Sequence, residues 1–420
     1  MPASGYRNNN DGGQNNVGNN GNYWSASPNS NNAYNLNFNN NGNVNPSNNN
    51  NRANGYSVRC LQASVGGEYP ELLTDLFTAY FCARKNKRNT TSQMRFERNL
   101  PENLMRLYGE IVSGRYCVGR SMCFIIRDPV LREVFAASFR DRIIHHLLYN
   151  WLMPIFEPTF IYDSYSCREG KGTLFGIKRL EHHIRSCSDN YRKECYVLKL
   201  DIEGYFMNIN RQRLYDMIVS RLQKYSSIHR VSFDLSLALR LLSQVIFNDP
   251  VKGCYRKGRV SDWDELPKSK SLFYALSGCG LPIGNLTSQL FSNIYLSSLD
   301  DFVKRELKLR HYGRYVDDFY IVGNYREDLL AAIPVIRDFL FRELGLRLHP
   351  RKVHLTDIRR GVRFLGAVVK PYQRYAFRRG LSRAHSHVYE VLTDEQNPYV
   401  IKSVMQSYKG YLGHFDSFSH

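Results

Sequence analysis

The sequence predicts an α+β fold, and three observations support this expectation. The chain has 420 residues, enough for two to three domains, and its hydrophobic content of 43% is enough for a sizeable core. Segments with the apolar spacing of helices are interspersed with short segments that alternate as strands do. Two strand-like segments, 311–316 and 319–322, follow one another as a hairpin. Helices mixed with antiparallel hairpins are typical of the α+β class.

The helical segments can be placed in order along the chain. Ordered sequence is expected to begin near Glu68, and the clearest helical pattern covers 131–151, where apolar side chains recur every four positions. His145 and His146 lie off that stripe and are expected at a polar face or core edge. The apolar stripe consists of Phe135, Phe139, Ile143, Leu147 and Trp151. The other expected helices cover 69–83, 101–113, 173–185 (after a Gly-rich turn at 168–173), 211–224, 233–247, 286–308, 380–392 and 399–411.

The strand-like segments are shorter. In 196–202, Leu198 and Leu200 point one way while Lys199 and Asp201 point the other, as period-two alternation requires. A further strand-like segment covers 361–369, and residues 248–278 form an irregular insertion rich in Gly, Lys and Arg.

The charge balance indicates a polyanionic partner. Lys and Arg number 57 against 38 Asp and Glu, which gives a net charge of +19. No apolar stretch approaches the roughly 18 residues of a membrane helix, and the first residues lack the basic and apolar regions of a secretory signal. We therefore expect a cytoplasmic protein with no membrane partner.

Cysteine spacing gives little sign of a metal site. The nine cysteines contain no C-x-x-C pair and no companion histidine at zinc spacing. Reduced, mostly buried thiols are the favoured interpretation, and a structural zinc site is the alternative.

The first 60 residues differ from the rest of the chain. They hold 23 Asn, whereas the other 360 residues hold 13. A segment of this composition buries too little apolar surface to offset the entropy of ordering it, so a disordered, non-catalytic head is expected. The aromatic and small residues in 23–27 and 55–60 nevertheless look like the end of a lectin-like domain.

Three carboxylates are the strongest candidates for chemistry. Asp201 ends a strand, and Asp317 with Asp318 lies at the hairpin 116 residues later. Phosphoryl transfer to a nucleotide uses two Mg²⁺ ions roughly 3.5–4 Å apart, and Mg²⁺ prefers hard oxygen ligands. Taken alone, the Asp-Asp pair is better explained as a solvated turn.

The context of these carboxylates resembles the reverse transcriptase family. Residues 201–206 and 315–319 resemble the first and third palm motifs, and residues 281–289 resemble the motif that lies between them. With Ile283 and Gln289, this middle motif is similar to that of diversity-generating retroelements, and the resemblance runs from about Glu68 to Gly413. It also includes 135–142, 166–172 and 363–366.

This resemblance implies a right-hand polymerase. Residues 61–195 would form N-terminal helices and fingers, and residues 196–358 a ferredoxin-like palm with an antiparallel sheet, interrupted by the insertion near 248–278. Residues 359–420 would form the primer grip and a short helical thumb. The implied activity is synthesis of DNA from dNTPs on an RNA template.

The resemblance also implies roles for the residues of the site. The metal site would comprise Asp201, Ile202, Asp317 and Asp318, holding two Mg²⁺ with Mn²⁺ as a substitute, and Lys352 would protonate pyrophosphate as a general acid.

Other residues would bind the incoming nucleotide. Backbone amides around Gly204 and Tyr205 would cradle the triphosphate, and Phe206 would be the steric gate against the sugar 2′-OH, with an ordinary core Phe as the alternative. Arg127 and Arg132 would clasp phosphates, with a solvated basic face as the alternative.

Position 283, directly before Gly284 in the nucleotide-binding motif, holds Ile, whereas most reverse transcriptases have Gln at this position. An isoleucine packs but makes no hydrogen bond near the nascent base pair, so a low-fidelity enzyme is the hypothesis.

The nucleic-acid contacts are expected near the C-terminus. Residues 359–383 hold eight basic residues and no acid, with Tyr372, Tyr375 and Phe377 interleaved among them. The expected primer–template contacts are Gln289, the grip motif Phe364-Leu365-Gly366, Arg374, Arg378 and Arg379, with a solvated face as the alternative; the cluster 84–98 would track template RNA.

The Asn-rich head has a second interpretation within the retroelement family. Asn codons begin with two adenines. If the polymerase makes errors at template adenines, an AAC codon changes into codons for other residues, and none of them is a stop codon because no stop codon ends in C. Residues 5–60 would then be the translation of a template repeat fused ahead of the polymerase, with a true start near Met94 or around position 65. The alternative is an RNA-binding low-complexity tail.

The expected partners are template RNA, primer and cDNA, dNTPs and a small basic accessory protein, in a bacterial or phage-encoded system. Competing interpretations are a retron, group II intron or phage-defence reverse transcriptase, or a non-catalytic RNA-binding scaffold.

Overall fold

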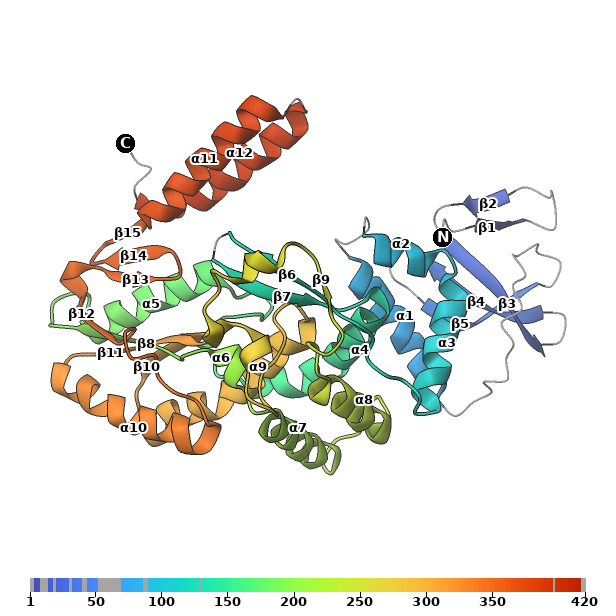
Figure 1. The fold of residues 1–420 in the computed structure, drawn as a ribbon, viewed down its shortest axis with the longest axis horizontal. Helices are drawn as coiled ribbons and strands as arrows, with labels where there is room; N and C mark the ends of the chain where they lie inside the picture. Colours follow the sequence, from blue (N-terminus) through green and yellow to red (C-terminus); the bar gives the residue numbers. More distant parts are fainter. Residues whose placement is uncertain are drawn as a thin grey trace. The chain divides into compact units, whose positions relative to one another are not determined.

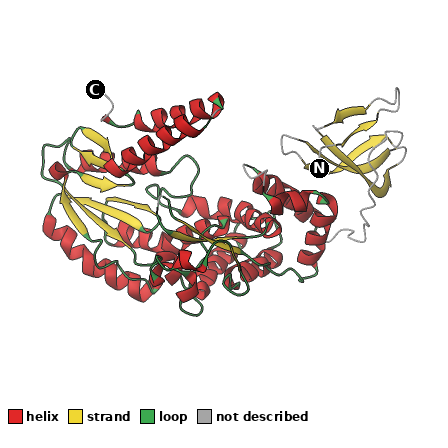
Figure 2. Cartoon of the chain, turned by 45° about the horizontal axis from the view of Figure 1, so that its top comes forward, coloured by secondary structure: helices red, strands yellow, loops and turns green. Residues whose placement is uncertain are grey.

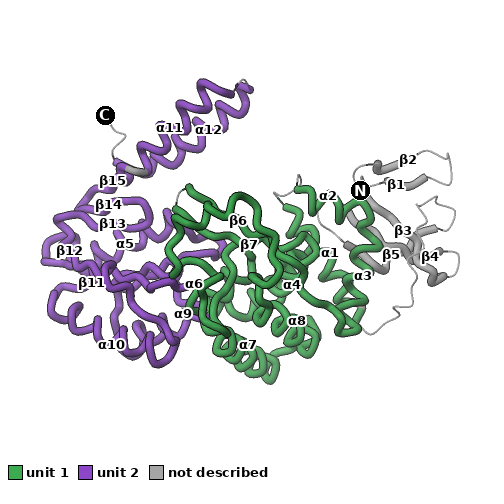
Figure 3. Tube along the Cα trace, viewed as in Figure 1, with its two compact units in different colours: residues 1–158, 206–294 green, residues 159–205, 295–420 purple. Residues whose placement is uncertain are grey.

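The computed structural model describes the backbone of residues 4–7, 14–17, 20–29, 32–39, 44–51, 69–85, 90–128, 130–395 and 397–416. Side chains are described in the same ranges except for residues 4–51, Pro70 and Arg379. The chain divides into two compact units, residues 1–158 with 206–294 and residues 159–205 with 295–420 (Figure 3). Each unit therefore combines two separate stretches of sequence.

The Asn-rich head contains strands, so the expectation of a disordered segment is wrong over the described ranges. In 34–38, Tyr, Leu and Phe alternate with Asn, and this period of two favours a strand whatever the overall composition. All pairings are antiparallel: β1 with β2, and β4 with both β3 and β5. The strands are β1 (Ser4–Arg7), β2 (Gln14–Val17), β3 (Asn20–Asn29), β4 (Asn32–Asn39) and β5 (Val44–Asn51).

The described residues of the first unit lie mainly in helices. The helices expected over 69–83, 101–113, 211–224 and 233–247 are confirmed, and α2 was not predicted. The helices are α1 (Pro70–Arg84), α2 (Thr91–Glu97), α3 (Leu100–Val112), α4 (Phe139–Phe156), α7 (Arg211–Ser226) and α8 (Leu235–Phe247).

The helix predicted over 131–151 is wrong in its first part. Residues Arg132–Ala136 form strand β7, and α4 begins only at Phe139, because the Ser138 side chain accepts the Asp141 N–H and caps the helix. Phe135 is buried on the strand, so its spacing from Phe139 is coincidental. His145 is buried in α4, with Nδ1 2.8 Å from the Thr287 hydroxyl, as a core histidine.

Strand β7 belongs to a three-stranded sheet with β6 (Met122–Ile126) and β9 (Tyr255–Arg256). β6 is antiparallel to β7 and parallel to β9. The irregular insertion 248–278 supplies β9 and three short 3-10 turns, Val260–Trp263, Lys268–Lys270 and Leu272–Tyr274.

The second unit contains a four-stranded antiparallel sheet in the order β10-β11-β8-β12. Its strands are β8 (Tyr196–Asp201), β10 (His311–Tyr315), β11 (Asp318–Gly323) and β12 (His354–Asp357). The predicted strand and hairpin are confirmed, and so is the helix after the Gly-rich turn. The helices of this unit that accompany the sheet are α5 (Thr173–Cys187) and α10 (Arg326–Leu344). Two further helices contain residues of both units: the short α6 (Tyr205–Asn208), and α9 (Leu286–Asp301), which ends in a π turn over Phe302–Glu306.

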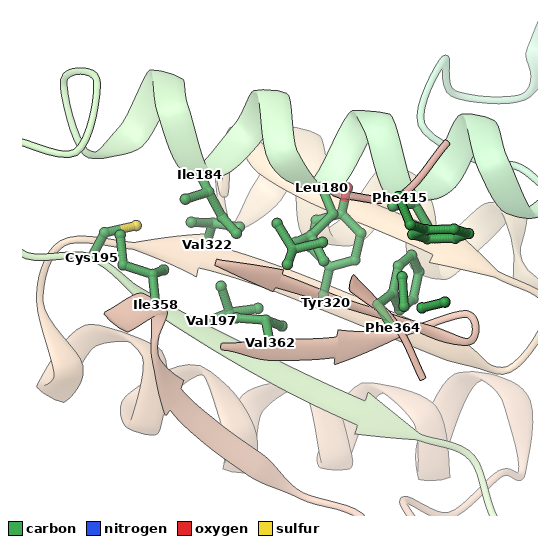
Figure 4. Packing of buried hydrophobic residues seen from close by; sticks show 14 of the residues in the cluster. Leu180, Ile184, Cys195, Val197, Tyr320, Val322, Ile358, Val362, Phe364 and Phe415 are labelled. Atoms are coloured by element: carbon green, nitrogen blue, oxygen red, sulfur yellow. The ribbon is translucent and has the colours of Figure 1, made fainter. Parts of the chain in front are cut away.

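A hydrophobic core lies between α5 and this sheet (Figure 4). Leu180 and Ile184 of α5 pack with Tyr320 and Val322 of β11, and all four side chains are buried. Residues from β13 (Val362–Phe364) and β14 (Ala367–Lys370) complete this core, and β15 (Gln373–Ala376) pairs with β14.

The chain ends in two helices, α11 (Arg378–Asp394) and α12 (Pro398–Leu412), which lie side by side (Figures 1 and 2). Both were predicted. Within the described ranges, the helices are too short or too polar to cross a bilayer. The eight cysteines in the same ranges are all free thiols, and Cys60 lies outside them.

Candidate active site

The sheet of the second unit brings two of the predicted carboxylates opposite each other. Residue Asp318 at the start of β11 pairs in register with Asp201 at the end of β8. Directly opposed residues on antiparallel strands have Cβ atoms roughly 4.5–5.5 Å apart, so both carboxylates lie on one face at one edge of the sheet. Asp317 precedes Asp318 in the β10–β11 turn, and its carbonyl accepts the Ile202 N–H at 3.3 Å.

The turn that carries Asp317 has an unusual backbone. Val316 has a φ of 55°, in the left-handed region that β-branched residues rarely adopt. Its carbonyl accepts a hydrogen bond of 3.0 Å from Nη1 of Arg314. A side chain from the preceding strand therefore helps to hold the strained turn in place.

Arg314 is itself held by a buried ion pair with Asp300 at the end of α9. The side chains of Arg314 and Asp300 are 0% and 1% exposed. Nε and Nη2 of Arg314 lie 2.7 and 2.6 Å from the two Asp300 carboxylate oxygens, and Tyr312 donates a further hydrogen bond to Asp300. Burial alone would lower the pKa of Arg314, but the Asp300 carboxylate raises this pKa above its ordinary value.

Sequence reasoning missed Arg314 and Asp300. The available signal was an arginine inside the strand that leads to the Asp317 turn, where a charged side chain needs a partner. The position of its partner 14 residues earlier, at the end of a helix, follows only from the three-dimensional fold.

Two lysines contact the carboxylates. Lys352 Nζ lies 2.8 Å from Asp201 Oδ2, and Lys199 Nζ lies 3.2 Å from Asp318 Oδ2. The Lys199 ammonium also lies over the Phe364 ring, 5.5 Å from its centroid. Lys352 was predicted for this site, whereas Lys199 was not. Lys199 and Asp201 are two positions apart on β8 and therefore lie on the same face of the strand.

The carboxylates repel one another. Burial, followed by the charge of Asp201, raises the pKa of Asp317 to about 6. Burial also raises the pKa of Asp318, while Lys199 counteracts this shift. Divalent cations would relieve such a concentration of negative charge.

The donor set fits Mg²⁺, which prefers carboxylate oxygens. Among the described residues, the structure contains no preformed cluster of three or more His, Cys, Asp or Glu side chains arranged around a metal. Asp201 and Asp318 are instead neutralised by the two lysines. Asp201, Asp317 and Asp318 are the residues that would hold cations here, next to the Ile202 backbone.

The predicted triphosphate cradle follows β8 directly. The Ile202 and Glu203 N–H groups donate to the carbonyls of Asp317 and Arg347, and Gly204 has a φ of 54°. Tyr205 is buried and Phe206 is half-buried at the start of α6.

The motif around Ile283 is fixed against β7 in the first unit. The Ile283 carbonyl accepts the Phe135 N–H at 2.8 Å. Gly284 has a φ of +124°, and a Cβ there would lie 2.7 Å from the Phe135 carbonyl oxygen, so only glycine fits. The Ile283 side chain packs against the cluster that contains Phe135 and Leu272, and Gln289 is exposed on α9.

The two predicted phosphate-binding arginines lie at opposite ends of the loop between β6 and β7. Arg127 is 54% exposed and forms ion pairs with Asp262 (3.2 Å) and Glu265 (2.8 Å) of the insertion. Arg132 is exposed at the start of β7. These two ion pairs connect Arg127 to the insertion 248–278, and the sequence analysis did not predict them.

The predicted primer grip forms the β13–β14 turn. The Phe364 side chain is 1% exposed and its ring packs edge-on against Tyr320, so it supports the core and cannot itself contact nucleic acid; this corrects the prediction for its side chain. Leu365 and Gly366 have φ values of 48° and 87°. Arg374 is half-buried beside Glu181 and Arg378 is exposed, whereas the side chain of Arg379 lies outside the described residues.

A family model described as reverse transcriptase (RNA-dependent DNA polymerase) matches residues 131–369. Protein YkfC of Escherichia coli (strain K12) is 22% identical over 318 residues, which cover 67% of this chain and 75% of that protein.

Solved structures of telomerase also match. Apo telomerase from Candida tropicalis, truncated from its C-terminal domain, has a TM-score of 0.42 at 13% identity, covering 61% of this chain and 55% of that chain. Telomerase from Candida albicans in complex with a TWJ fragment of telomeric RNA has a TM-score of 0.42 at 12% identity, covering 66% of this chain and 51% of that chain. The chain spans about half the length of these telomerase chains.

Proposed function

Because the chain belongs to the reverse transcriptase family of RNA-dependent DNA polymerases, we propose that its carboxylate site copies an RNA template into DNA from dNTPs and releases pyrophosphate. The observation that carries this proposal is the register of β8 and β11, which sets Asp201 opposite Asp318 with Asp317 in the adjoining turn. The family model covers all three residues.

Within this site the residues have separate tasks. Asp201, Asp317 and Asp318 would hold two Mg²⁺, or Mn²⁺ as a substitute, and such ions activate the attacking 3′-oxygen and neutralise the triphosphate. Asp317 must be deprotonated to bind a cation, and its pKa of about 6 leaves it mostly ionised at neutral pH. Lys352 would act as the general acid toward pyrophosphate, and its Nζ lies 2.8 Å from Asp201 Oδ2.

The finer arrangement is also part of the proposal. Residues 61–195 would form the N-terminal helices and fingers, residues 196–358 the palm, and residues 359–420 the primer grip and thumb. The residues that would serve the nucleotide are Arg127, Arg132, Gly204, Tyr205, Phe206, Ile283 and Gly284. Primer and template would contact Gln289, the turn around Leu365 and Gly366, and Arg374, Arg378 and Arg379. A cytoplasmic location follows from the proposed role.

We further propose that the enzyme is of the diversity-generating class and makes errors at template adenines, so that its cDNA diversifies a variable gene. Support comes from Ile283 and Gln289 in the middle motif and from the Asn-rich head. Ile283 offers only packing where a glutamine would offer hydrogen bonds. A template RNA and a small basic accessory protein would be the partners.

Primer extension on an RNA template tests the activity. The wild-type chain should extend the primer with dNTPs and Mg²⁺, and Asp317→Ala should not; equal extension by both would contradict the proposal. Sequencing the products tests the class, because errors should concentrate at template adenines and should decrease in Ile283→Gln. An even error spectrum would favour a retron, group II intron or phage-defence enzyme, and RNA binding without synthesis would favour a scaffold.

A further inference from the structure

Two of the free thiols lie close together in the second unit, and the mechanism proposed above uses neither. Cys187 is the last residue of α5, and Cys195 directly precedes β8. Cys195 is 1% exposed in the hydrophobic core between α5 and the sheet (Figure 4), and half-buried Cys187 packs against the same core. The two thiols share a hydrogen bond.

Asn324, the residue after β11, joins the two chain segments that carry these thiols. Its Nδ2 donates hydrogen bonds to the carbonyls of Cys187 (2.9 Å) and Glu194 (2.8 Å). Its Oδ1 accepts a hydrogen bond of 3.4 Å from the Cys187 thiol. A single side chain therefore holds the end of α5 beside the residue that precedes Cys195.

The loop 188–193 between the two cysteines is tight and strained. A hydrogen bond of 2.9 Å from the Lys193 N–H to the Ser188 carbonyl closes its base. Three consecutive residues inside the loop adopt the left-handed backbone conformation, with φ values of 51°, 54° and 67° at Asp189, Asn190 and Tyr191. Such a conformation persists only where surrounding contacts hold it.

One of these contacts comes from the turn between β14 and β15. The Tyr372 hydroxyl in this turn donates a hydrogen bond of 3.3 Å to the Asn190 carbonyl, and the centroids of the Tyr372 and Tyr191 rings are 4.5 Å apart. Arg374 on β15 forms an ion pair of 3.3 Å with Glu181 of α5. A covalent link at the base of the loop would therefore restrain the contact between α5 and the β14–β15 turn.

The two thiols differ in reactivity. The hydrogen bond with Cys195 lowers the pKa of Cys187, whereas the same hydrogen bond, together with burial, raises the pKa of Cys195. The thiolate is the nucleophile in thiol–disulfide exchange, and it must be accessible to its reagent. Half-buried Cys187 is therefore suited to attack first, and buried Cys195 to resolve the product.

We propose that Cys187 and Cys195 are a redox modification site, which forms a reversible disulfide on reaction with a low-molecular-weight disulfide of the glutathione type. In the first exchange the Cys187 sulfur attacks the reagent and forms a mixed disulfide, and the released reagent thiolate takes the Cys187 proton. In the second exchange the Cys195 sulfur attacks the Cys187 sulfur, and the second reagent thiolate takes the Cys195 proton. Two protein thiols are thus oxidised to one disulfide, while one reagent disulfide is reduced to two thiols.

Disulfides in reducing compartments are usually transient, which fits a reversible link better than a structural one. The site is independent of the proposed polymerase function, because it uses no residue of the carboxylate site.

Peptide mapping of the full chain tests the proposal. The native wild-type chain is incubated with oxidised glutathione, its remaining thiols are blocked with iodoacetamide, and it is digested with trypsin. Cleavage after Arg192 and Lys193 separates the two cysteines into peptides 186–192 and 194–199. Mass spectrometry should find these two peptides joined, and treatment with reduced glutathione before blocking should separate them.

Three variants test the order of the two exchanges. Cys195→Ser should stop at a mixed disulfide between Cys187 and glutathione, because the resolving thiol is missing. Cys187→Ser should leave Cys195 unmodified, because that thiol is buried. Cys167→Ser, which removes an exposed cysteine of the same unit, is the matched control and should form the link as the wild type does.

Three results would overturn the proposal: no joined peptides in the wild type, a link from Cys187 to Cys167 as abundant as the link to Cys195, or glutathione on Cys195 in native Cys187→Ser. The wild-type map requires no substitution, so misfolding of a variant cannot decide the outcome. Primer extension by the reduced chain is a separate measurement, and its failure would leave the thiol result unchanged.

Discussion

Removing one partner of the buried pair Asp300–Arg314 should strongly destabilise the second unit, because it leaves the other charge buried without compensation. Asp300→Asn keeps the shape of the side chain but removes the charge, and it leaves Arg314 buried without its counter-ion. The pair is at most 1% exposed, and Asp300 accepts three hydrogen bonds of 2.6–2.7 Å from Arg314 and Tyr312. Removing one partner of such a pair costs roughly 3–5 kcal/mol, so the free energy of unfolding should fall by about that amount.

Urea denaturation of the full chain measures this effect, and Asp338→Asn is the matched control. Asp338 pairs with Arg342 one helical turn away at 2.8 Å, but both side chains are more than half exposed. An exposed pair of this kind contributes roughly 0.3–0.5 kcal/mol. Equal losses in the two variants would refute the reasoning, since burial would then have no energetic consequence.

Asp300→Asn should also change the backbone of the turn that carries Asp317. Arg314 holds the Val316 carbonyl, and the neighbouring Asp317 carbonyl accepts the Ile202 N–H. In Asp300→Asn the turn should loosen, and hydrogen exchange of the Ile202 amide should accelerate relative to Asp338→Asn. Unchanged exchange at Ile202 would show that Arg314 does not hold the turn.

Two further predictions concern the first unit and the dependence of stability on pH. Gly284→Ala places a Cβ 2.7 Å from the Phe135 carbonyl at a φ of +124°, so urea denaturation should show a loss of roughly 1–3 kcal/mol. Gly109→Ala on α3, where a Cβ meets nothing within 4 Å, should gain roughly 0.5–1 kcal/mol, and similar effects of the two substitutions would contradict the close packing at Gly284. Burial, helped by neighbouring positive charges, lowers the pKa of His145 from 6.5 to about 3, so the unfolded chain binds a proton below pH 6.5 that the folded chain does not. Stability should therefore fall by about 1.4 kcal/mol per pH unit from this residue as the pH drops from 6.5 toward 3, and a wild-type slope retained in His145→Gln would argue against it.

Much of the fold could be predicted from local patterns, because apolar residues recur along the sequence with the spacing of a helix or of a strand. The β8 strand and the β10–β11 hairpin were predicted from local patterns, whereas the role of their carboxylates was predicted only from the resemblance to a family; the structure pairs Asp318 with Asp201. The segment 131–151 shows the limit of this reasoning: a four-residue spacing between Phe135 and Phe139 fits a helix, but the pairing of Phe135 with Cys123 makes it a strand. Strand pairing is a long-range interaction that spacing does not reveal.

The parts that were missed depend on tertiary contacts. Asp300 meets Arg314 only after α9 packs beside β10, and Glu133 binds an insertion more than 100 residues away. Phe364 was expected at nucleic acid because of its motif, but Tyr320 and the sheet bury it. A motif identifies a turn, and packing decides which of its side chains face solvent.

The central claim is that Asp201 and Asp317 act together in nucleotide addition. The rate of single-nucleotide addition to an RNA-templated primer, measured in Asp201→Asn, Asp317→Asn and the double variant, tests it most directly. Groups that act as one unit have non-additive effects, so each single variant should lose about 10³-fold or more and the double variant should lose little beyond that. A single variant that retains the wild-type rate, or losses that multiply in the double variant, would contradict the claim.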